Sequence, residues 1–398
     1  MSAVIRGKTV YVLGAGFSKA AGFPLQSEIL PRIREFRPEN IDIISTPNFA
    51  PFEENDELLF PFLNTIFERS QPTLEDIFTL LDQAIARREY CQNYSWEKLE
   101  EVRRVLKTAV LFVLHDASEK IDEQQEYFYQ SIAAHFIDER IKAPLDDEPL
   151  SFLLLNWDSL LEDQIYKCLR RTNGIGKADI DYCCKTLPLA TSPHTGSPIQ
   201  KAKGIYNIKI IKLHGSSNWL RCPNCNKLFT GIGGEIGVWE QYAVPQPCPD
   251  CSSGTRTFDE DSEPRLEPFM ITPTYVKLFD NTHIQAIWDE AYLTLAEADK
   301  VIFIGYSLPE ADYHFRTLLK RALRRDVEVS FVGRATSQAA ANTAKRLRQY
   351  FPVTRYTNFF GPSIEFDLTG SEGYFGGVLG ERTLVNRMRS LKRRFRGL

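Results

Sequence analysis

Four cysteines near the middle of the chain have the spacing of a metal site. They form two Cys-x-x-Cys pairs on either side of residues 226–247, and they are Cys222, Cys225, Cys248 and Cys251. Two such pairs can present four thiolates to one tetrahedral ion, which is the arrangement of zinc in a zinc ribbon. Because four protein ligands leave no open position, the zinc is expected to be structural and not catalytic. A redox or disulfide role is the alternative.

A glycine turn near the N-terminus suits the binding of a phosphate. Gly14-Ala15-Gly16-Phe17-Ser18 follows a short β-rich run and precedes a helix-like stretch. Glycines let backbone N–H groups approach a pyrophosphate, and a helix N-terminus favours its negative charge. The third glycine of the usual dinucleotide fingerprint is missing, because Lys19 stands in its place. A tight strand–helix turn without a ligand therefore stays open as the alternative.

Three further polar clusters directly follow expected strands. They are Asn156 with Asp158, His214 with Gly215, and Gly305 with Ser307. Ligands of open α/β sheets bind in the crevice outside the carboxyl ends of the strands. Four such clusters in one chain therefore predict a single binding site at that edge of the sheet.

Asn156, Asp158 and His214 have side chains that suit chemistry on a sugar. Asparagine both donates and accepts, so it can hold a ribose hydroxyl or a water, and aspartate can accept from a carboxamide N–H. Histidine accepts protons near neutral pH. An Asx cap on the following helix is the alternative for the Asn–Asp pair. A structural histidine is the alternative for His214.

The elements that would carry these clusters alternate between strands and helices. Strands are expected at 9–13, 151–155, 205–213, 269–271, 301–304 and 327–332. Helices are expected from residue 73 and at 96–114, 124–137, 159–166, 281–298, 312–325 and 337–348. Residues 171–204 are expected to be loop-rich. This alternation predicts a parallel sheet with helices on both faces.

Composition and charge exclude several classes of protein. The 398 residues exceed one ordinary domain, and 43% hydrophobic residues can form a large core, so the chain is not disordered. The net charge of −4 does not indicate nucleic-acid binding. No apolar run approaches the length of a membrane span, and the N-terminus does not read as a signal peptide. We therefore expect a cytoplasmic protein.

Taken in order, these motifs resemble the sirtuin family. Sirtuins carry Gly-Ala-Gly-x-Ser after the first strand, then Asn-x-Asp, His-Gly, two Cys-x-x-Cys knuckles and a Gly-x-Ser. This chain has the same series within residues 9–333. Its segment Gly305-Tyr306-Ser307-Leu308-Pro309-Glu310-Ala311-Asp312 resembles in particular the bacterial sirtuin-like proteins of antiviral defence.

The resemblance implies a role for each cluster in binding NAD. The residues expected to hold the pyrophosphate and the adenosine side are Gly14, Ala15, Gly16, Ser18, Gly305 and Ser307. The expected catalytic residues are Asn156, Asp158 and His214. Of these, Asp158 would grip the carboxamide, Asn156 would place a water or ribose hydroxyl, and His214 would accept a proton.

Departures from the family pattern favour NAD hydrolysis over protein deacylation. Where sirtuin deacylases read Gly-Ile-Pro-Asp-Phe-Arg, this chain continues from Gly22 as Phe23-Pro24-Leu25-Gln26. The Phe-Gly-Glu segment that helps hold acyl-lysine is replaced by residues 269–273. We expect an NAD+ glycohydrolase that releases nicotinamide and ADP-ribose and depletes NAD in antiphage defence. A deacylase or ADP-ribosyltransferase, and a non-catalytic NAD- or ADP-ribose-binding assembly subunit, are the alternatives.

The expected fold class is α/β, with a Rossmann-like doubly wound parallel sheet formed by residues 1–29, 146–221 and 268–360. A helical insertion is expected at 30–145, a zinc ribbon at 222–267 and a tail with a basic helix at 361–398. In that tail, six basic residues and no acid follow Leu384, among apolar residues at helical spacing.

This pattern predicts a helix that docks on an apolar surface. Its basic face either lies in solvent or contacts an acidic neighbour or nucleic acid. A homo-oligomer is expected, with a HerA-like ATPase or another defence protein as the partner that the resemblance implies.

Overall fold

The computed structural model describes the chain in several stretches. These are residues 7–35, 55–68, 70–188, 204–231, 246–252, 263–274, 281–309, 311–332, 357–358 and 384–397. Within them, the strands are β1 (Thr9–Leu13), β2 (Leu150–Leu154), β3 (Ala178–Asp181), β4 (Thr186–Pro188), β5 (Tyr206–Lys212), β6 (Gly215–Arg221), β7 (Leu228–Thr230), β8 (Glu267–Met270), β9 (Lys300–Ile304), β10 (Glu328–Val332) and β11 (Thr357–Asn358).

The helices of the same stretches connect these strands. They are α1 (Ala15–Ser18), η1 (Lys19–Ala21), α2 (Gln26–Glu35), η4 (Asn55–Leu59), α4 (Phe60–Ile66), α5 (Leu74–Arg87), α6 (Trp96–Glu119), α7 (Glu123–Lys142), α8 (Leu160–Thr172), α10 (Pro249–Ser252), α11 (Thr282–Ala296), α12 (Tyr313–Ala322) and α15 (Leu384–Arg396). The helix expected at 337–348 lies outside the described residues. Among the described helices, none combines the length and the apolar composition that a membrane crossing requires.

The main sheet is parallel and has the strand order of a Rossmann fold. Its strands lie in the order β11-β10-β9-β1-β2-β5-β3, and each neighbouring pair is parallel. Apart from β3 at the β5 edge, the strands follow the doubly wound order 3-2-1-4-5-6 when they are numbered along the chain. The predicted doubly wound parallel sheet is therefore confirmed, and its switch point lies between β1 and β9.

The registers of the central strands bring the predicted clusters to one edge. Leu13 at the end of β1 is level with Leu154 of β2 and with Ile304 of β9. These strands are almost wholly apolar and buried, as expected for parallel strands covered on both faces. The residues that follow them, from 14, 155 and 305, consequently leave the sheet side by side.

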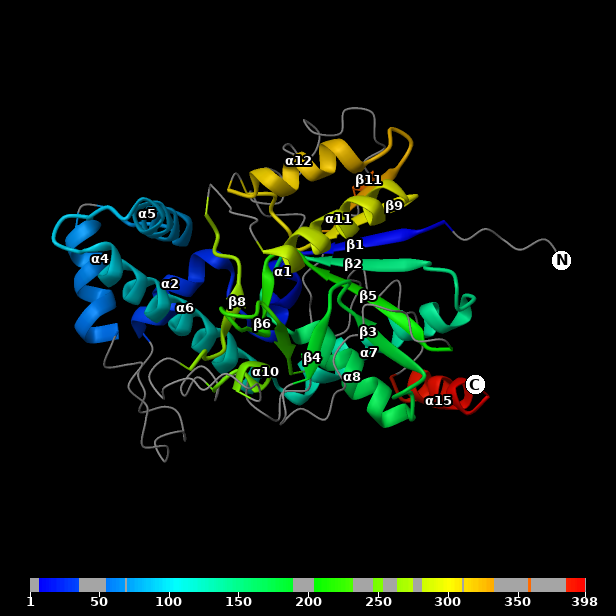
Figure 1. Ribbon diagram of the computed structural model, residues 1–398. Coiled ribbons are helices and arrows are strands. Elements are labelled where there is room, and N and C mark those ends of the chain that lie inside the picture. The colour runs from blue at the N-terminus through cyan, green and yellow to red at the C-terminus, as the bar shows by residue number, and fades with distance from the viewer. Residues whose placement is uncertain are drawn as a thin grey trace.

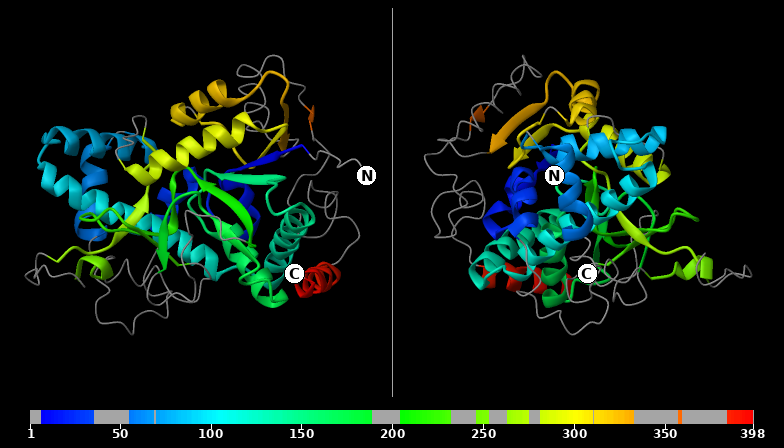
Figure 2. Two further views of the ribbon diagram at one scale, coloured as in Figure 1. Left: turned by 45° about the vertical axis from the view of Figure 1, so that its right-hand side comes forward. Right: turned by 90° about the vertical axis from the view of Figure 1, so that its left-hand side faces the viewer.

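Helices cover both faces of this sheet (Figures 1 and 2). Helices α11 and α12 lie on one face, and α7 and α8 lie on the other. The tail helix α15 packs on α7 and α8, where Leu391 and Phe395 are buried. Its apolar side is thus covered by helices of the same chain.

The other helices before α7 gather beyond the edge where β1 and β2 end (Figure 1). Helix α6 packs against α2, α5 and η4. Helix α5 begins with a capping box, in which Thr73 and Asp76 satisfy each other's backbone N–H groups, and the sequence predicts a helix start there. This helical group forms a wall beside the strand ends.

A second, smaller sheet carries the cysteines. Its strands lie in the order β4-β7-β6-β8, so the sheet includes β6 and β8, which flank residues 222–267, as well as β7 within them. The prediction of a loop-rich segment at 171–204 is wrong at three places, because α8 runs on to Thr172 and the strands β3 and β4 follow. In β3, Asp179 and Asp181 alternate with buried residues and mask the strand in the sequence.

Candidate functional site at the strand ends

The glycine turn is packed against the end of β9. Gly14 N donates to Ile304 O at 3.1 Å, and Gly16 N donates to Gly305 O at 2.8 Å. A Cβ atom on Gly305, whose φ is +63°, would lie 2.1 Å from Phe17 N. The close approach of two backbones therefore requires glycine here, whether or not a phosphate binds.

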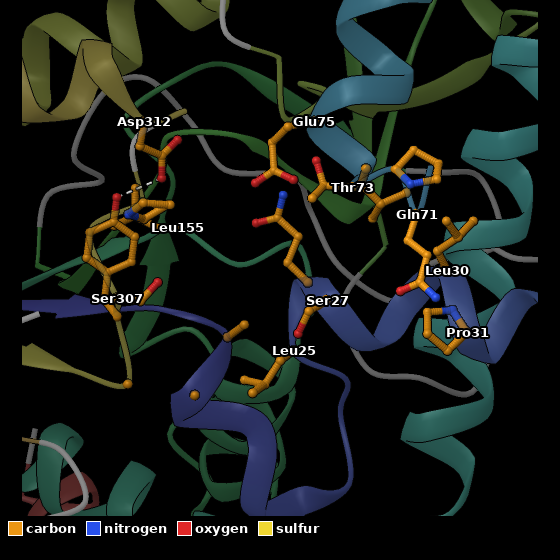
Figure 3. A pocket seen from close by; sticks show the side chains of 18 of the residues that line it. Leu25, Ser27, Leu30, Pro31, Gln71, Thr73, Glu75, Leu155, Ser307 and Asp312 are labelled. Atoms are coloured by element: carbon orange, nitrogen blue, oxygen red, sulfur yellow. Dashed lines mark hydrogen bonds between the residues drawn. The ribbon is translucent and has the colours of Figure 1, made fainter. Parts of the chain in front are cut away.

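A cleft of about 800 Å³ opens at this point (Figure 3). Ala15, Gly16, Gly305 and Ser307 line it on the side of the sheet. Helix α2 and the first turn of α5 form the other side, from which Glu75 faces the cleft. The volume is in the range of small-molecule and cofactor sites. The other two expected binding residues, Gly14 and Ser18, are not among the described residues that line the cleft.

An inner pocket of about 70 Å³ adjoins the cleft. Asn156, Asp158 and His214 line this pocket, so the structure brings the three expected catalytic residues together. The pocket shares Ala15, Gln26, Leu155 and Asp312 with the cleft. The two cavities together form one elongated site at the switch point of the sheet, where ligands of such folds bind.

Ser18, Asn156 and Asp158 form a buried hydrogen-bond network. Ser18 Oγ donates to Asp158 Oδ1 at 2.9 Å, and Asn156 Nδ2 donates to Ser18 Oγ at 3.1 Å and to Asp158 Oδ2 at 2.6 Å. Asp158 Oδ1 also accepts from Leu160 N at 3.3 Å, although the N-cap residue of α8 is Ser159, whose side chain makes no capping bond within the described residues. Asn156 Oδ1 is buried and has no partner among the described residues. Because buried polar atoms in native proteins are normally satisfied, this acceptor is available to a ligand that enters the inner pocket.

A buried ion pair lies next to this hydrogen-bond network. Lys212 and Glu162 are both fully buried, with Nζ and Oε1 2.8 Å apart, and Lys212 Nζ also donates to Asp158 O at 2.5 Å. Lys212 is the last residue of β5, and Glu162 lies in the first turn of α8. The pair therefore connects β5 to the segment that carries Asp158.

Breaking this ion pair should destabilise the protein strongly. Lys212→Met leaves the Glu162 carboxylate buried without a partner, and we expect the free energy of unfolding to fall by about 3–5 kcal/mol. Adding Glu162→Leu should restore most of the loss, since an apolar pair replaces the ions. Chemical denaturation measures these values. As control, Lys300→Met removes the exposed ion pair with Glu328 and should cost about 1 kcal/mol or less. A double variant no more stable than Lys212→Met would contradict this account.

His214 lies beside an acidic residue, Asp312, for which the sequence predicted no role in the site. Asp312 Oδ1 is 3.3 Å from His214 Nε2, and Asp312 Oδ2 accepts from Tyr306 Oη at 2.7 Å. The sequence signal that could have identified Asp312 is its position as the last residue of the Gly305–Asp312 segment.

Glu75 is the second functional candidate that the sequence analysis missed. It lies in the first turn of α5, and no pattern in the sequence connects it with the strand ends. Burial raises the pKa of the Glu75 carboxyl, and the nearby charges of Asp312 and Asp76 raise that pKa further. The cleft therefore has two facing acidic groups, Glu75 and Asp312, on opposite sides of the site.

The four cysteines of the small sheet meet at one point. Their Sγ atoms all lie within 4.8 Å of one another, with Cys222 and Cys251 3.8 Å apart and Cys225 and Cys248 3.7 Å apart. Four thiolates at about 2.3 Å from a tetrahedral ion would be about 3.8 Å apart, so this cluster could hold a zinc ion. The predicted grouping of the four residues is confirmed.

Comparison with known proteins finds similar solved structures. No protein-family model matches the chain, and no curated protein matches it. The chain is similar to a Sir2 homologue in complex with NAD, at 15% identity and a TM-score of 0.39 over 97% of this chain and 91% of the other. It is also similar to a mutant Sir2 homologue in an ADP-ribose complex, at 16% identity and a TM-score of 0.37 over 97% and 93%. A sirtuin studied for substrate affinity has 14% identity and a TM-score of 0.34 over 94% and 93%.

The fold assignment itself rests on the sheet. The strand order, the parallel pairing and the cleft at the switch point are observed directly in this chain. The chain is thus a Rossmann-like α/β protein with a four-cysteine cluster, and the solved structures to which it is similar include Sir2 homologues.

Proposed function

We propose that the chain is an NAD+ hydrolase that cleaves the nicotinamide–ribose bond. The observation that carries the proposal is the buried Asn156 Oδ1 in the inner pocket, which has no hydrogen-bond partner within the described part of the chain. The same pocket holds His214, and it adjoins a cofactor-sized cleft at the switch point of a Rossmann-ordered sheet. A dinucleotide in the cleft would extend its nicotinamide end into the pocket.

Each side chain of the pocket would have one task. Asn156 Oδ1 would accept from a ribose hydroxyl or from the attacking water. A carboxylate offers about four acceptor sites, and the described residues fill three on Asp158, so one remains for the carboxamide N–H. Ala15, Gly16, Gly305 and Ser307 would line the pyrophosphate and adenosine side. Ser18 and Gly14 would act indirectly, by holding Asp158 and the turn.

The chemistry needs positioning more than strong acid catalysis. The bond between ribose C1′ and the pyridinium nitrogen breaks, and its electron pair neutralises that nitrogen. Water forms the new bond to C1′, and its proton passes to His214 and then to solvent. NAD+ and water thereby give nicotinamide, ADP-ribose and one proton. The pocket contributes by orienting the reactants and stabilising the oxocarbenium-like sugar.

The helical group beside the cleft favours hydrolysis over deacylation. In the family that the motifs resemble, the segment matching residues 269–273 helps hold acyl-lysine. Here Thr272 is buried, and its Oγ1 donates to Asp82 Oδ2 of α5 at 2.9 Å. Leu114 of α6 lines the inner pocket together with Ile271 and Pro273. Helices α5 and α6 thus occupy the surroundings of this segment, where a peptide would need space.

Incubating the protein with NAD alone tests the proposal. We expect nicotinamide and ADP-ribose in equal amounts without any acylated peptide, as measured by chromatography. Turnover that requires an acylated peptide would favour the deacylase alternative, and transfer of ADP-ribose to protein would favour the transferase. Binding of NAD without turnover, alone and with partners, would favour a non-catalytic assembly subunit.

We also propose that the four-cysteine cluster binds one structural zinc ion. Cys222, Cys225, Cys248 and Cys251 supply four sulfur ligands, so no position remains for a substrate. Cys251 Sγ accepts from Asn224 Nδ2 at 3.4 Å, and Cys222 Sγ accepts from Cys225 N at 3.4 Å. Such N–H donors suit thiolates that carry negative charge.

The resemblance of the Gly305–Asp312 segment to defence proteins supports a role in NAD depletion within an assembly. We propose that a homo-oligomer, or a complex with a HerA-like ATPase or another defence protein, forms through the basic face of α15. Arg394 pairs with Asp138 at 3.1 Å, whereas Arg389, Lys392, Arg393 and Arg396 are exposed. Since the apolar side of α15 is covered by its own chain, the basic face is the side available to an acidic partner surface.

The assembly proposal predicts a salt-dependent molar mass. Light scattering should show a complex at low salt, alone or with a candidate ATPase, that weakens at high salt because screening reduces charge attraction. Changing Arg389, Lys392, Arg393 and Arg396 to glutamine should abolish it. A control variant changes the exposed Lys98, Lys120, Lys185 and Arg325 to glutamine. Monomers under every condition, or equal loss in both variants, would speak against α15 as the contact.

A further inference from the structure

Asp312 has an unusual environment for a residue at the start of a helix. It is the N-cap of α12, where an aspartate normally accepts hydrogen bonds from the first-turn N–H groups. Within the part of the chain that the structure describes, its side chain makes no such bond. The carboxylate instead accepts from Tyr306 Oη at 2.7 Å and faces His214 Nε2 at 3.3 Å. Its side chain is thus directed toward the site and not toward its own helix.

The surroundings hold Asp312 in place. Its backbone N donates to Pro309 O at 3.2 Å, and its carbonyl accepts from Arg316 N at 3.0 Å. Tyr306 is buried, and its ring packs edge-on against Phe315 with centroids 5.6 Å apart. Figure 3 shows Asp312 at the edge of the cleft near Ser307. A carboxylate restrained in this way can orient another side chain.

A carboxylate on one nitrogen of an imidazole has two chemical consequences. A carboxylate 3.3 Å from Nε2 favours the neutral tautomer with its proton on Nε2, which would leave the lone pair on Nδ1. When the ring takes up a second proton, the adjacent negative charge stabilises the imidazolium. Both effects make the histidine a better proton acceptor.

We propose that Asp312 is a positioning residue that fixes the tautomer of His214 and stabilises its protonated form, with Tyr306 holding the carboxylate. The catalytic part of this inference rests on the proposed NAD hydrolysis. The His214–Asp312 coupling itself is a property of the free protein and can be measured without substrate.

Other charged groups surround the pair and must be kept constant in a test. Asp158 lies in the same inner pocket, and Glu75 of α5 faces Asp312 from across the cleft. Lys212 of β5 contacts the backbone of Asp158. None of them changes in Asp312→Asn, which keeps the shape of the side chain and removes its charge. The difference between the two proteins therefore isolates Asp312.

The first experiment is an NMR titration of the His214 ring. The ring signal of His214 is assigned as the one that is missing from the spectrum of His214→Asn. Loss of an opposite charge at this distance should lower the pKa of His214 by about one unit or more in Asp312→Asn. Asp289→Asn, the same change at an exposed site of α11, is the control and should leave that pKa unchanged. An equal His214 pKa in the unmodified protein and Asp312→Asn would overturn the proposal, whatever the enzyme activity.

The second experiment measures kinetics with NAD. Asp312→Asn should lower kcat about 10- to 1000-fold with KM changed less than about threefold, and the acidic limb of the pH profile should move to lower pH. Tyr306→Phe keeps the charge, so the His214 pKa should stay within about 0.5 units while kcat falls about three- to tenfold.

The kinetic result also separates the two proposals. A rise in KM alone would mean that Asp312 contacts substrate instead of His214, and it would overturn the positioning role. If the unmodified protein does not turn over NAD, the proposed function is wrong. The titration would still show whether Asp312 raises the pKa of His214.

Discussion

His214→Ala is expected to lower nicotinamide release from NAD by about two to four powers of ten, because it removes the proton acceptor of the inner pocket. Asn156→Ala should cause a loss of similar size, since it removes a buried acceptor of the inner pocket that has no partner among the described residues. The two side chains lie in one pocket but come from segments that follow β2 and β5. A loss in both variants would therefore point to a shared reaction centre.

The measurement is the initial rate of nicotinamide release, with circular dichroism to verify folding. His135→Gln on α7 is the matched control, because that histidine contacts Arg387 of α15 and lies outside the pocket. Its rate should stay within about twofold of the unmodified protein. Near-normal turnover by a folded His214→Ala protein would remove His214 from the mechanism.

Removal of the metal from the four-cysteine cluster should have the largest effect on stability. We expect about one zinc per chain, and structural zinc sites can contribute about 10 kcal/mol or more to folding. Without zinc, four thiolates within 4.8 Å of one another would repel or take up protons. Strands β6, β7 and β8, which pair around the cysteines, should then lose their order.

Metal analysis and limited proteolysis test this prediction. Cys248→Ser should lose the zinc and become sensitive to protease near residues 222–251, before any specific effect on NAD turnover. Cys91→Ser, which changes a half-buried cysteine outside the cluster, should keep the metal and the resistance. A protein purified without chelator that contains no zinc would show that the cluster has another role.

Much of the fold could be predicted from local patterns. The runs at 9–13 and 301–304 are mostly apolar and are followed by glycine, so they indicate buried parallel strands. The Cys-x-x-Cys spacing predicts that the four cysteines group together, because each tight turn places two thiols on the same side. Polar residues after each strand indicate the ligand edge, since every parallel strand ends at the same side.

Some features depended on contacts between distant segments. The strand β3 was missed because its alternating aspartates resemble a loop until β5 pairs with it. The sequence did not indicate the backbone contact of Gly14 and Gly16 with Gly305, which leaves no room for a Cβ atom on either residue. The hydrogen bond from Ser18 to Asp158 joins residues that are 140 positions apart, so no local pattern indicates it.

The sequence by itself determined the α/β class, the grouping of the four cysteines and the identity of Asn156, Asp158 and His214 as candidates, because each depends on residue types at short spacing. Only the tertiary structure decided which groups surround them. Asp312 reaches His214 because α12 begins beside the end of β5, and Glu75 reaches the cleft because α5 packs across the strand ends. The chemistry of a side chain depends on the neighbours that packing places around it. When those neighbours come from distant segments, their spacing along the chain does not indicate the contact.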